Sequence, residues 1–203
     1  FYADANNLYY RRIVTGTPSA STTQVNVIAT LKAASNHYDV CVVGTRLILS
    51  YNTTGSAINS HYIDASYTLS ASSARAVDAD NCLTLAPDDA AGEFWVAWCN
   101  AAGQVIAERQ SAATLGTLTG FQLLESVTAV RISAAVTASG GTLTAFYEIA
   151  GASNNLNRVR VNTMTRAGVV GTAASVRRGV GLVGRAFAVS GIVYAVVAHE
   201  SPS

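Results

Sequence analysis

Short runs of apolar, β-branched and aromatic residues recur along the chain, and their starts are 47, 49 and 50 residues apart. Each run follows a second β-rich run across a short turn that contains glycine. Glycine supplies the positive φ that tight hairpin turns need, so the pattern predicts a β-hairpin at every repeat. The second strands of these hairpins are residues 47–51, 94–98, 143–147 and 193–197.

The same spacing identifies two more strands in each repeat. Third strands are expected at 58–64, 105–109 and 158–163, and fourth strands at 71–77, 120–127 and 172–180. The opening segments 8–14 and 24–31 match the third and fourth strands of the repeat. Turn residues and β-branched residues recur too often to leave a window with the 3.6-residue period of a helix.

A repeat of about 48 residues with four antiparallel strands is typical of a β-propeller blade, so we expect an all-β, propeller-like array. If the two half units at the ends pair, the array closes as a four-bladed ring. If they do not, the chain is a portion of a longer protein and its exposed edges need a partner. The predicted units are 1–35 (second half of a blade), 36–80, 81–128, 129–180 (complete blades) and 181–203 (first half of a blade).

Charge is low overall but uneven. The formal net charge of +1 and the 12% of charged residues argue against a dedicated nucleic-acid module, which usually has a strong basic excess. Between residues 149 and 199, however, there are six arginines and no acidic residue. This basic strip predicts contacts to DNA phosphates or to an acidic partner; the alternative is a solvated or subunit-facing edge. Its members are Arg158, Arg160, Arg166, Arg177, Arg178 and Arg185.

Residues that carry chemistry are few. Three histidines and three cysteines are scattered without metal-ligand spacing or a nucleophile motif. We therefore predict no catalytic residue, no metal, no cofactor and no enzymatic activity. Cys82 and Cys99 stand symmetrically about a predicted turn, so a disulfide is geometrically feasible, although buried thiols are favoured. The acidic residues around 78–89 are expected in solvated loops.

Seven aromatic residues fall in the predicted second strands. Packing between blades explains them, because stacked sheets need large side chains at equivalent places. A sugar-stacking platform is the alternative. The residues are Tyr51, Phe94, Trp95, Trp98, Phe146, Tyr147 and Tyr194.

Residues 176–194 combine a fourth strand, a small-residue link around Gly181–Gly184, and a first strand that ends in a glycine turn before Tyr194. This pattern resembles a blade junction in the tail proteins of short-tailed bacteriophages. The resemblance covers about 20 residues, and the rest of the chain is similar only in period and strand pattern. It implies a β-propeller subunit of a tail tube, nozzle or hub.

The resemblance also implies a role. We expect a structural virion protein that forms part of the DNA-ejection conduit, assembled in the host cytoplasm. Its partners would be identical subunits in a ring, expected to be a hexamer, together with tail adaptor, fibre or spike proteins and DNA in transit. The longest apolar stretch, 192–198, is too short for a membrane span. The alternative is a carbohydrate- or receptor-binding, lectin-like propeller, which would gather aromatic and acidic residues in one set of loops.

Overall fold

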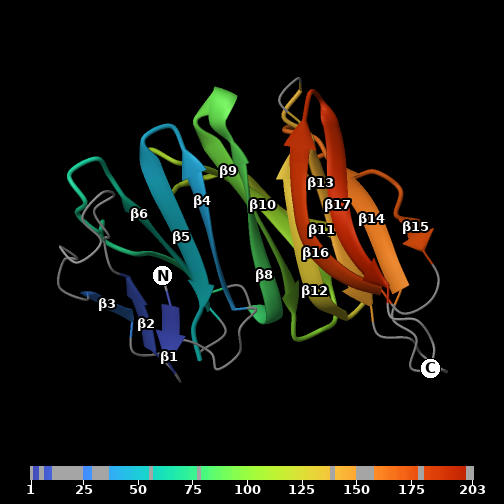
Figure 1. Cartoon of the computed structure of the whole chain (residues 1–203), viewed down its shortest axis with the longest axis horizontal. Helices are drawn as coiled ribbons and strands as arrows, with labels where there is room; N and C mark the ends of the chain where they lie inside the picture. Colours follow the sequence, from blue (N-terminus) through green and yellow to red (C-terminus); the bar gives the residue numbers. More distant parts are fainter. Residues whose placement is uncertain are drawn as a thin grey trace.

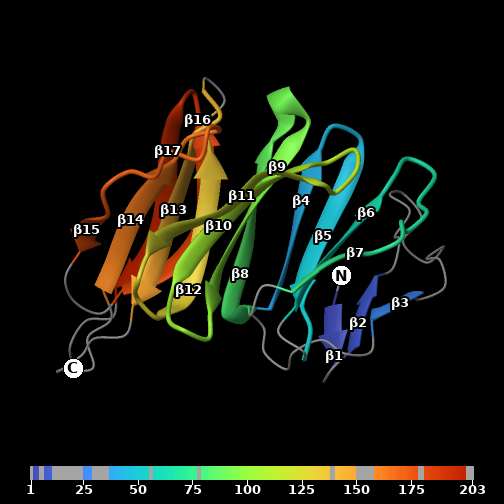
Figure 2. The same ribbon diagram turned by 180° about the vertical axis from the view of Figure 1, so that it is seen from behind.

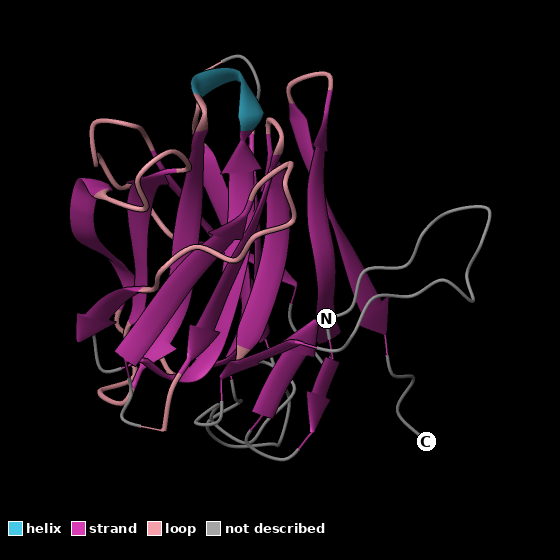
Figure 3. Ribbon diagram, turned by 90° about the vertical axis from the view of Figure 1, so that its left-hand side faces the viewer, coloured by secondary structure: helices cyan, strands magenta, loops and turns pink. Residues whose placement is uncertain are grey.

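The computed structural model describes residues 2–4, 7–10, 25–28, 37–54, 57–76, 79–137, 140–149, 158–177 and 181–199. In these ranges the protein consists of 17 strands and one short 3-10 helix, η1 (Asp89–Ala91), at the tip of a hairpin. Figure 3 shows this helix as the one cyan element among magenta strands. The all-β prediction is confirmed.

The strands form five antiparallel sheets, which we number in chain order. Sheet 1 contains β1 (Tyr2–Asp4), β2 (Asn7–Tyr10) and β3 (Val25–Ile28). Sheet 2 contains β4 (Tyr38–Val43), β5 (Arg46–Asn52), β6 (Ala57–Ile63) and β7 (Ser73–Ala76). Sheet 3 contains β8 (Ala79–Asp88), β9 (Glu93–Asn100), β10 (Val105–Ser111) and β11 (Thr117–Glu125).

The last two sheets follow the same plan. Sheet 4 contains β12 (Ala129–Val136), β13 (Leu143–Ile149), β14 (Arg158–Met164) and β15 (Ala174–Arg177), and sheet 5 contains β16 (Gly181–Val189) and β17 (Ile192–His199). Each strand pairs with its neighbour in the sequence, so every sheet is a simple meander. Among the described residues no strand of sheet 1 pairs with sheet 5, and the two sheets lie at opposite ends of the array (Figure 1).

Consecutive sheets pack face to face around three apolar clusters. Strand β9 shows why: Phe94, Val96 and Trp98 point into the cluster shared with sheet 2. The alternate residues Trp95, Ala97 and Cys99 point into the cluster shared with sheet 4. Side chains alternate between the faces of a strand, so a strand with apolar residues at every position suits a sheet that is covered on both sides. A third cluster, around Leu8, Leu49 and Tyr51, joins sheets 1 and 2.

The first strands of sheets 2 to 5 lie at the centre of this arrangement. Strand β8 packs against β4 on one side and β12 on the other, and β12 in turn packs against β16. The remaining strands of each sheet extend away from this row, as the two opposite views in Figures 1 and 2 show. The row of first strands is therefore where residues from four sheets meet.

Candidate functional site

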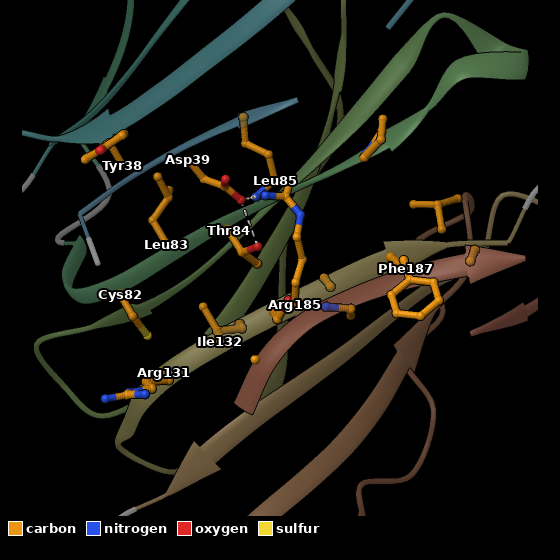
Figure 4. A pocket seen from close by; sticks show the side chains of 18 residues that line it. Tyr38, Asp39, Cys82, Leu83, Thr84, Leu85, Arg131, Ile132, Arg185 and Phe187 are labelled. Atoms are coloured by element: carbon orange, nitrogen blue, oxygen red, sulfur yellow. Dashed lines mark hydrogen bonds between the residues drawn. The ribbon is translucent and has the colours of Figure 1, made fainter. Parts of the chain in front are cut away.

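A cavity of about 540 Å³ opens between the first strands of sheets 2 to 5 (Figure 4). Its lining comes from β4, β8, β12 and β16 alone. Small residues leave much of the space, among them Ala134 and Ala135 on β12 and Gly184 and Ala188 on β16. The volume is in the range of sites that hold a small molecule.

Asp39 is held rigidly at one side of this cavity. Its Oδ2 accepts hydrogen bonds from the backbone N–H of Leu85 at 2.8 Å and from the hydroxyl of Thr84 at 3.1 Å. Its Oδ1 accepts the N–H of Val40 at 2.8 Å. The carboxylate thus joins β4 to β8 and keeps a fixed position, and it forms no ion pair with a described cation.

Arg185 faces Asp39 from the opposite side (Figure 4). The ladder between β16 and β17 is irregular here: Val183 pairs with Val197, whereas Ala186 pairs with Ala195. Between these two pairs, β16 contains two intervening residues and β17 contains one. The extra residue forms a β-bulge at Gly184 and Arg185. A bulge turns the local side chain out of the regular alternation, and bulges are frequent next to functional sites.

Gly184 lies close to β17 at this bulge. A Cβ on Gly184 would lie 3.0 Å from the carbonyl oxygen of Val196 and 3.2 Å from its Cβ. The absence of a side chain lets β17 approach closely, and the bulge then directs Arg185 into the cavity.

A second arginine lines the cavity from β12. Arg131 also lies beside a register shift, and its Nε is 4.0 Å from the buried carboxylate of Glu148. The next residues of β12 connect to β16, because the hydroxyl of Ser133 accepts the N–H of Ala186 at 2.7 Å. The rings of Tyr38 and Phe187 complete the lining.

This set of groups suits noncovalent binding. It offers two guanidinium groups, a fixed carboxylate, hydroxyl groups and two rings. No cluster of three or more His, Cys, Asp or Glu side chains that would hold a metal ion occurs in the described part of the chain. In the same part, no helix is long and apolar enough to cross a membrane.

Comparison with known proteins adds information on the fold. No family model matches the sequence, and no curated protein matches it. The chain is similar in structure to AofleA from Arthrobotrys oligospora. The TM-score is 0.57 at 12% sequence identity, and the match covers 95% of this chain and 53% of the AofleA chain. The protein thus spans about half of that longer chain, and at this identity the similarity concerns the fold alone.

Two of the six predicted arginines pair with acidic residues of the preceding sheet. Arg160 pairs with Glu125 at 2.8 Å, and Arg166 pairs with Asp88 at 2.5 Å and lies 3.8 Å from Glu93. These acids belong to sheet 3, so the two arginines connect sheets 3 and 4. Among those of the six whose side chains the structure describes, Arg185 lines the cavity. The backbones of Arg158 and Arg177 lie on β14 and β15, and Arg178 lies outside the described residues.

Of the seven predicted aromatic residues, five are buried in the clusters between sheets. Phe146 is half-buried, and Tyr194 is 46% exposed and stacks on Phe187 at 5.6 Å between ring centroids. The five buried residues are Tyr51, Phe94, Trp95, Trp98 and Tyr147.

The cysteines are buried thiols. Cys82 and Cys99 are directly paired residues of β8 and β9, yet no disulfide joins them. Burial is the main cause that raises the pKa of Cys82 and of Cys41 to about 12. For Cys41, the nearby Asp39 raises the pKa further and Arg185 lowers it.

His61, one of the three scattered histidines, lies inside β6, where its Nε2 is 3.0 Å from the hydroxyl of Tyr51 and its Nδ1 is 2.9 Å from the carbonyl of Ser70. One sequence expectation about exposure was wrong. Asp88 was expected in a solvated loop, but it is 3% exposed because it ends β8 and pairs with Arg166. Asp78 lies outside the described residues.

Proposed function

We propose that this chain is a non-catalytic structural module of β-propeller type, which assembles by docking sheet 5 onto sheet 1 of a second copy. The observation that supports this is an apolar face of sheet 5 that no described residue covers. We call it the sheet 5 face; it consists of Phe187, Val189, Ile192, Tyr194 and Val196.

The register explains why these side chains share one face. Phe187 pairs directly with Tyr194, and Val189 with Ile192, so each pair lies on the same side of the hairpin. Val196 follows Tyr194 by two positions and so points the same way. Each of the five is between 46% and 57% exposed. A contiguous apolar surface of this kind is typical of an interaction site.

The rest of the array indicates what would cover this face. In sheets 2, 3 and 4 the second strand pairs with a third strand, whereas β17 has no further partner among the described strands. Sheet 3 has a neighbouring sheet on each side. A second copy that places its sheet 1 against the sheet 5 face would continue the same stacking. Such a head-to-tail contact uses two different surfaces, and copies joined in this way form a ring when the rotation closes.

For the setting of this ring we propose the tail of a short-tailed bacteriophage, on the resemblance of residues 176–194. Identical subunits would form part of the DNA-ejection conduit and dock the neighbouring tail proteins. The pairing of Arg160 and Arg166 with acids of sheet 3 favours a mechanical role for these arginines over phosphate contacts. Labelling of purified virions with an antibody against this chain tests the setting, and absence of label on the tail would contradict it.

Native mass spectrometry with size-exclusion chromatography tests the assembly. We expect the protein to form a closed oligomer, and Ile192→Glu to convert it to monomers because the variant places a charge in the sheet 5 face. Val169→Glu is the matched control, since Val169 is 64% exposed on the loop after β14, away from this face. A monomeric wild-type protein at micromolar concentration, or equal loss of assembly in the control, would refute the proposal.

A further inference from the structure

We propose that the cavity between the first strands binds a small carboxylate-bearing sugar, such as a uronic acid. Its carboxylate would pair with Arg185, a hydroxyl would reach Asp39, and its ring would pack on Phe187. Phe187 belongs both to this cavity and to the sheet 5 face, but the charged groups Asp39 and Arg185 lie outside that face, so the inference does not rest on the assembly proposed above.

The hydrogen bonds of the lining leave one guanidinium group unused. Three charged side chains line the cavity: Asp39, Arg131 and Arg185. Asp39 is already held by three hydrogen-bond donors, and Arg131 lies 4.0 Å from Glu148. Arg185 makes no ion pair with any described residue, and its side chain is exposed to the cavity. Its donors are therefore used by no described residue, and the planar fork of a guanidinium group matches a carboxylate.

The position of Arg185 depends on a local device and not on the regular strand. The bulge at Gly184 and Arg185 interrupts the pairing of β16 with β17, and a Cβ on Gly184 would crowd Val196. The bulge holds the Arg185 side chain opposite a fixed carboxylate, whereas an arginine on a regular surface strand has no such fixed direction. This bulge is the arrangement expected where a side chain must be directed at a ligand.

The polar and apolar groups of the cavity match a sugar ring. Asp39 Oδ1 accepts one hydrogen bond from Val40, so a lone pair remains for a ligand hydroxyl. The ring of Phe187 and the methyl groups of Ala134 and Ala135 offer apolar surface to the C–H groups of a pyranose. A volume of about 540 Å³ accommodates a monosaccharide with water. A flat hydrocarbon acid would leave the carboxylate of Asp39 unused.

Isothermal titration calorimetry with glucuronate, galacturonate, glucose and inorganic phosphate tests the proposal. We expect a uronate to bind and glucose to bind at least tenfold more weakly, since glucose lacks the charged group. Arg185→Met should weaken uronate binding by about 10- to 100-fold, the range of a hydrogen-bonded charge pair. Gly184→Ala should weaken it as well, because a Cβ there disturbs the bulge.

Arg46→Met is the matched control. Arg46 lies on β5, stacks on the ring of Tyr62 and donates to the carbonyl of Ala112, away from the cavity. It should leave uronate binding unchanged, and circular dichroism confirms folding of each variant. Ile192→Glu should also retain binding, which separates this inference from the assembly. Absence of uronate binding, equal binding by Arg185→Met, or phosphate binding in place of uronate would overturn the proposal.

Discussion

A buried ion pair connects sheets 2 and 3, and it gives a quantitative test of the stacking. Arg75 on β7 donates to Glu108 on β10 at 2.5 Å, and the hydroxyl of Thr117 donates to the same carboxylate oxygen at 2.9 Å. The side chain of Glu108 is 0% exposed and that of Arg75 is 14% exposed. We consider the substitution Arg75→Met, which keeps most of the side-chain volume and removes the charge.

The substitution leaves the carboxylate of Glu108 buried without its cation. Removal of one partner of a buried pair usually costs 3–5 kcal/mol, and the slight exposure of Arg75 favours the lower end, about 3 kcal/mol. Most of this cost comes from the uncompensated charge and not from lost packing. The double variant Arg75→Met with Glu108→Gln removes that charge, so it should be less destabilised than Arg75→Met alone.

The loss of unfolding free energy caused by Arg75→Met, here called the deficit, should depend on pH. Burial is the main cause that raises the pKa of Glu108 above 4.5, and Arg75 opposes the shift. For a group whose pKa is raised on folding, the stability contribution is fully present below the unfolded pKa and is lost as pH rises through the folded pKa. Loss of Arg75 raises the pKa of Glu108 further. The deficit of Arg75→Met should therefore be largest near neutral pH and shrink on acidification, as Glu108 binds a proton.

Urea unfolding of the wild type and both variants, at about pH 7.5 and about pH 4.5, measures these free energies. Arg46→Met serves as a control arginine, because Arg46 stacks on Tyr62 and donates to the carbonyl of Ala112, so its loss leaves no buried carboxylate without a cation; this variant should cost less than Arg75→Met. The reasoning is refuted if Arg75→Met costs no more than this control, if its deficit is the same at both pH values, or if the double variant is as unstable as Arg75→Met.

Two further predictions concern turns and thiols. Gly103→Ala should destabilise the fold more than Gly44→Ala in the same urea assay: both glycines have positive φ, but a Cβ on Gly103 would lie 2.5 Å from Thr128 Oγ1, whereas one on Gly44 meets nothing within 4 Å. An equal loss of unfolding free energy in the two variants would show that Thr128 moves aside without cost. Cys41 and Cys82, with pKa values of about 12, should not react with a thiol reagent near pH 8 until the chain unfolds. Rapid labelling of the native protein would contradict their burial.

The strands could be predicted because their signal is local. Alternation of apolar residues and glycine turns identified the hairpins, and β9 at Glu93–Asn100 contains the predicted run 94–98. The predicted third and fourth strands of sheets 2 to 4 also overlap the observed ones. Strand β1 was missed because its three residues are too few to show a period. Closure of the array depends on how sheets meet in space, which no local pattern contains.

The basic strip was misleading for a related reason. Between residues 149 and 199 the sequence shows no acid, so the arginines seemed unpaired. Two of them, Arg160 and Arg166, pair with acids of the preceding sheet, which they reach only through stacking. In a stacked repeat, the charge of a surface is therefore set by neighbouring sheets together, and a count along one segment overestimates it.

Around the cavity, equivalent positions of the repeated sheets carry different side chains. In each hairpin of sheets 2 to 5, the position four residues before the last paired residue of the first strand lines the cavity. The repeat fixes the place of these residues, but each sheet supplies a different side chain: Asp39, Thr84, Ile132 and Arg185. Similarity between repeats identifies the framework of strands but not these positions, because they are the ones at which the repeats differ. The structure brings the four together, and it joins an anion, a hydroxyl, an apolar group and a cation around one space.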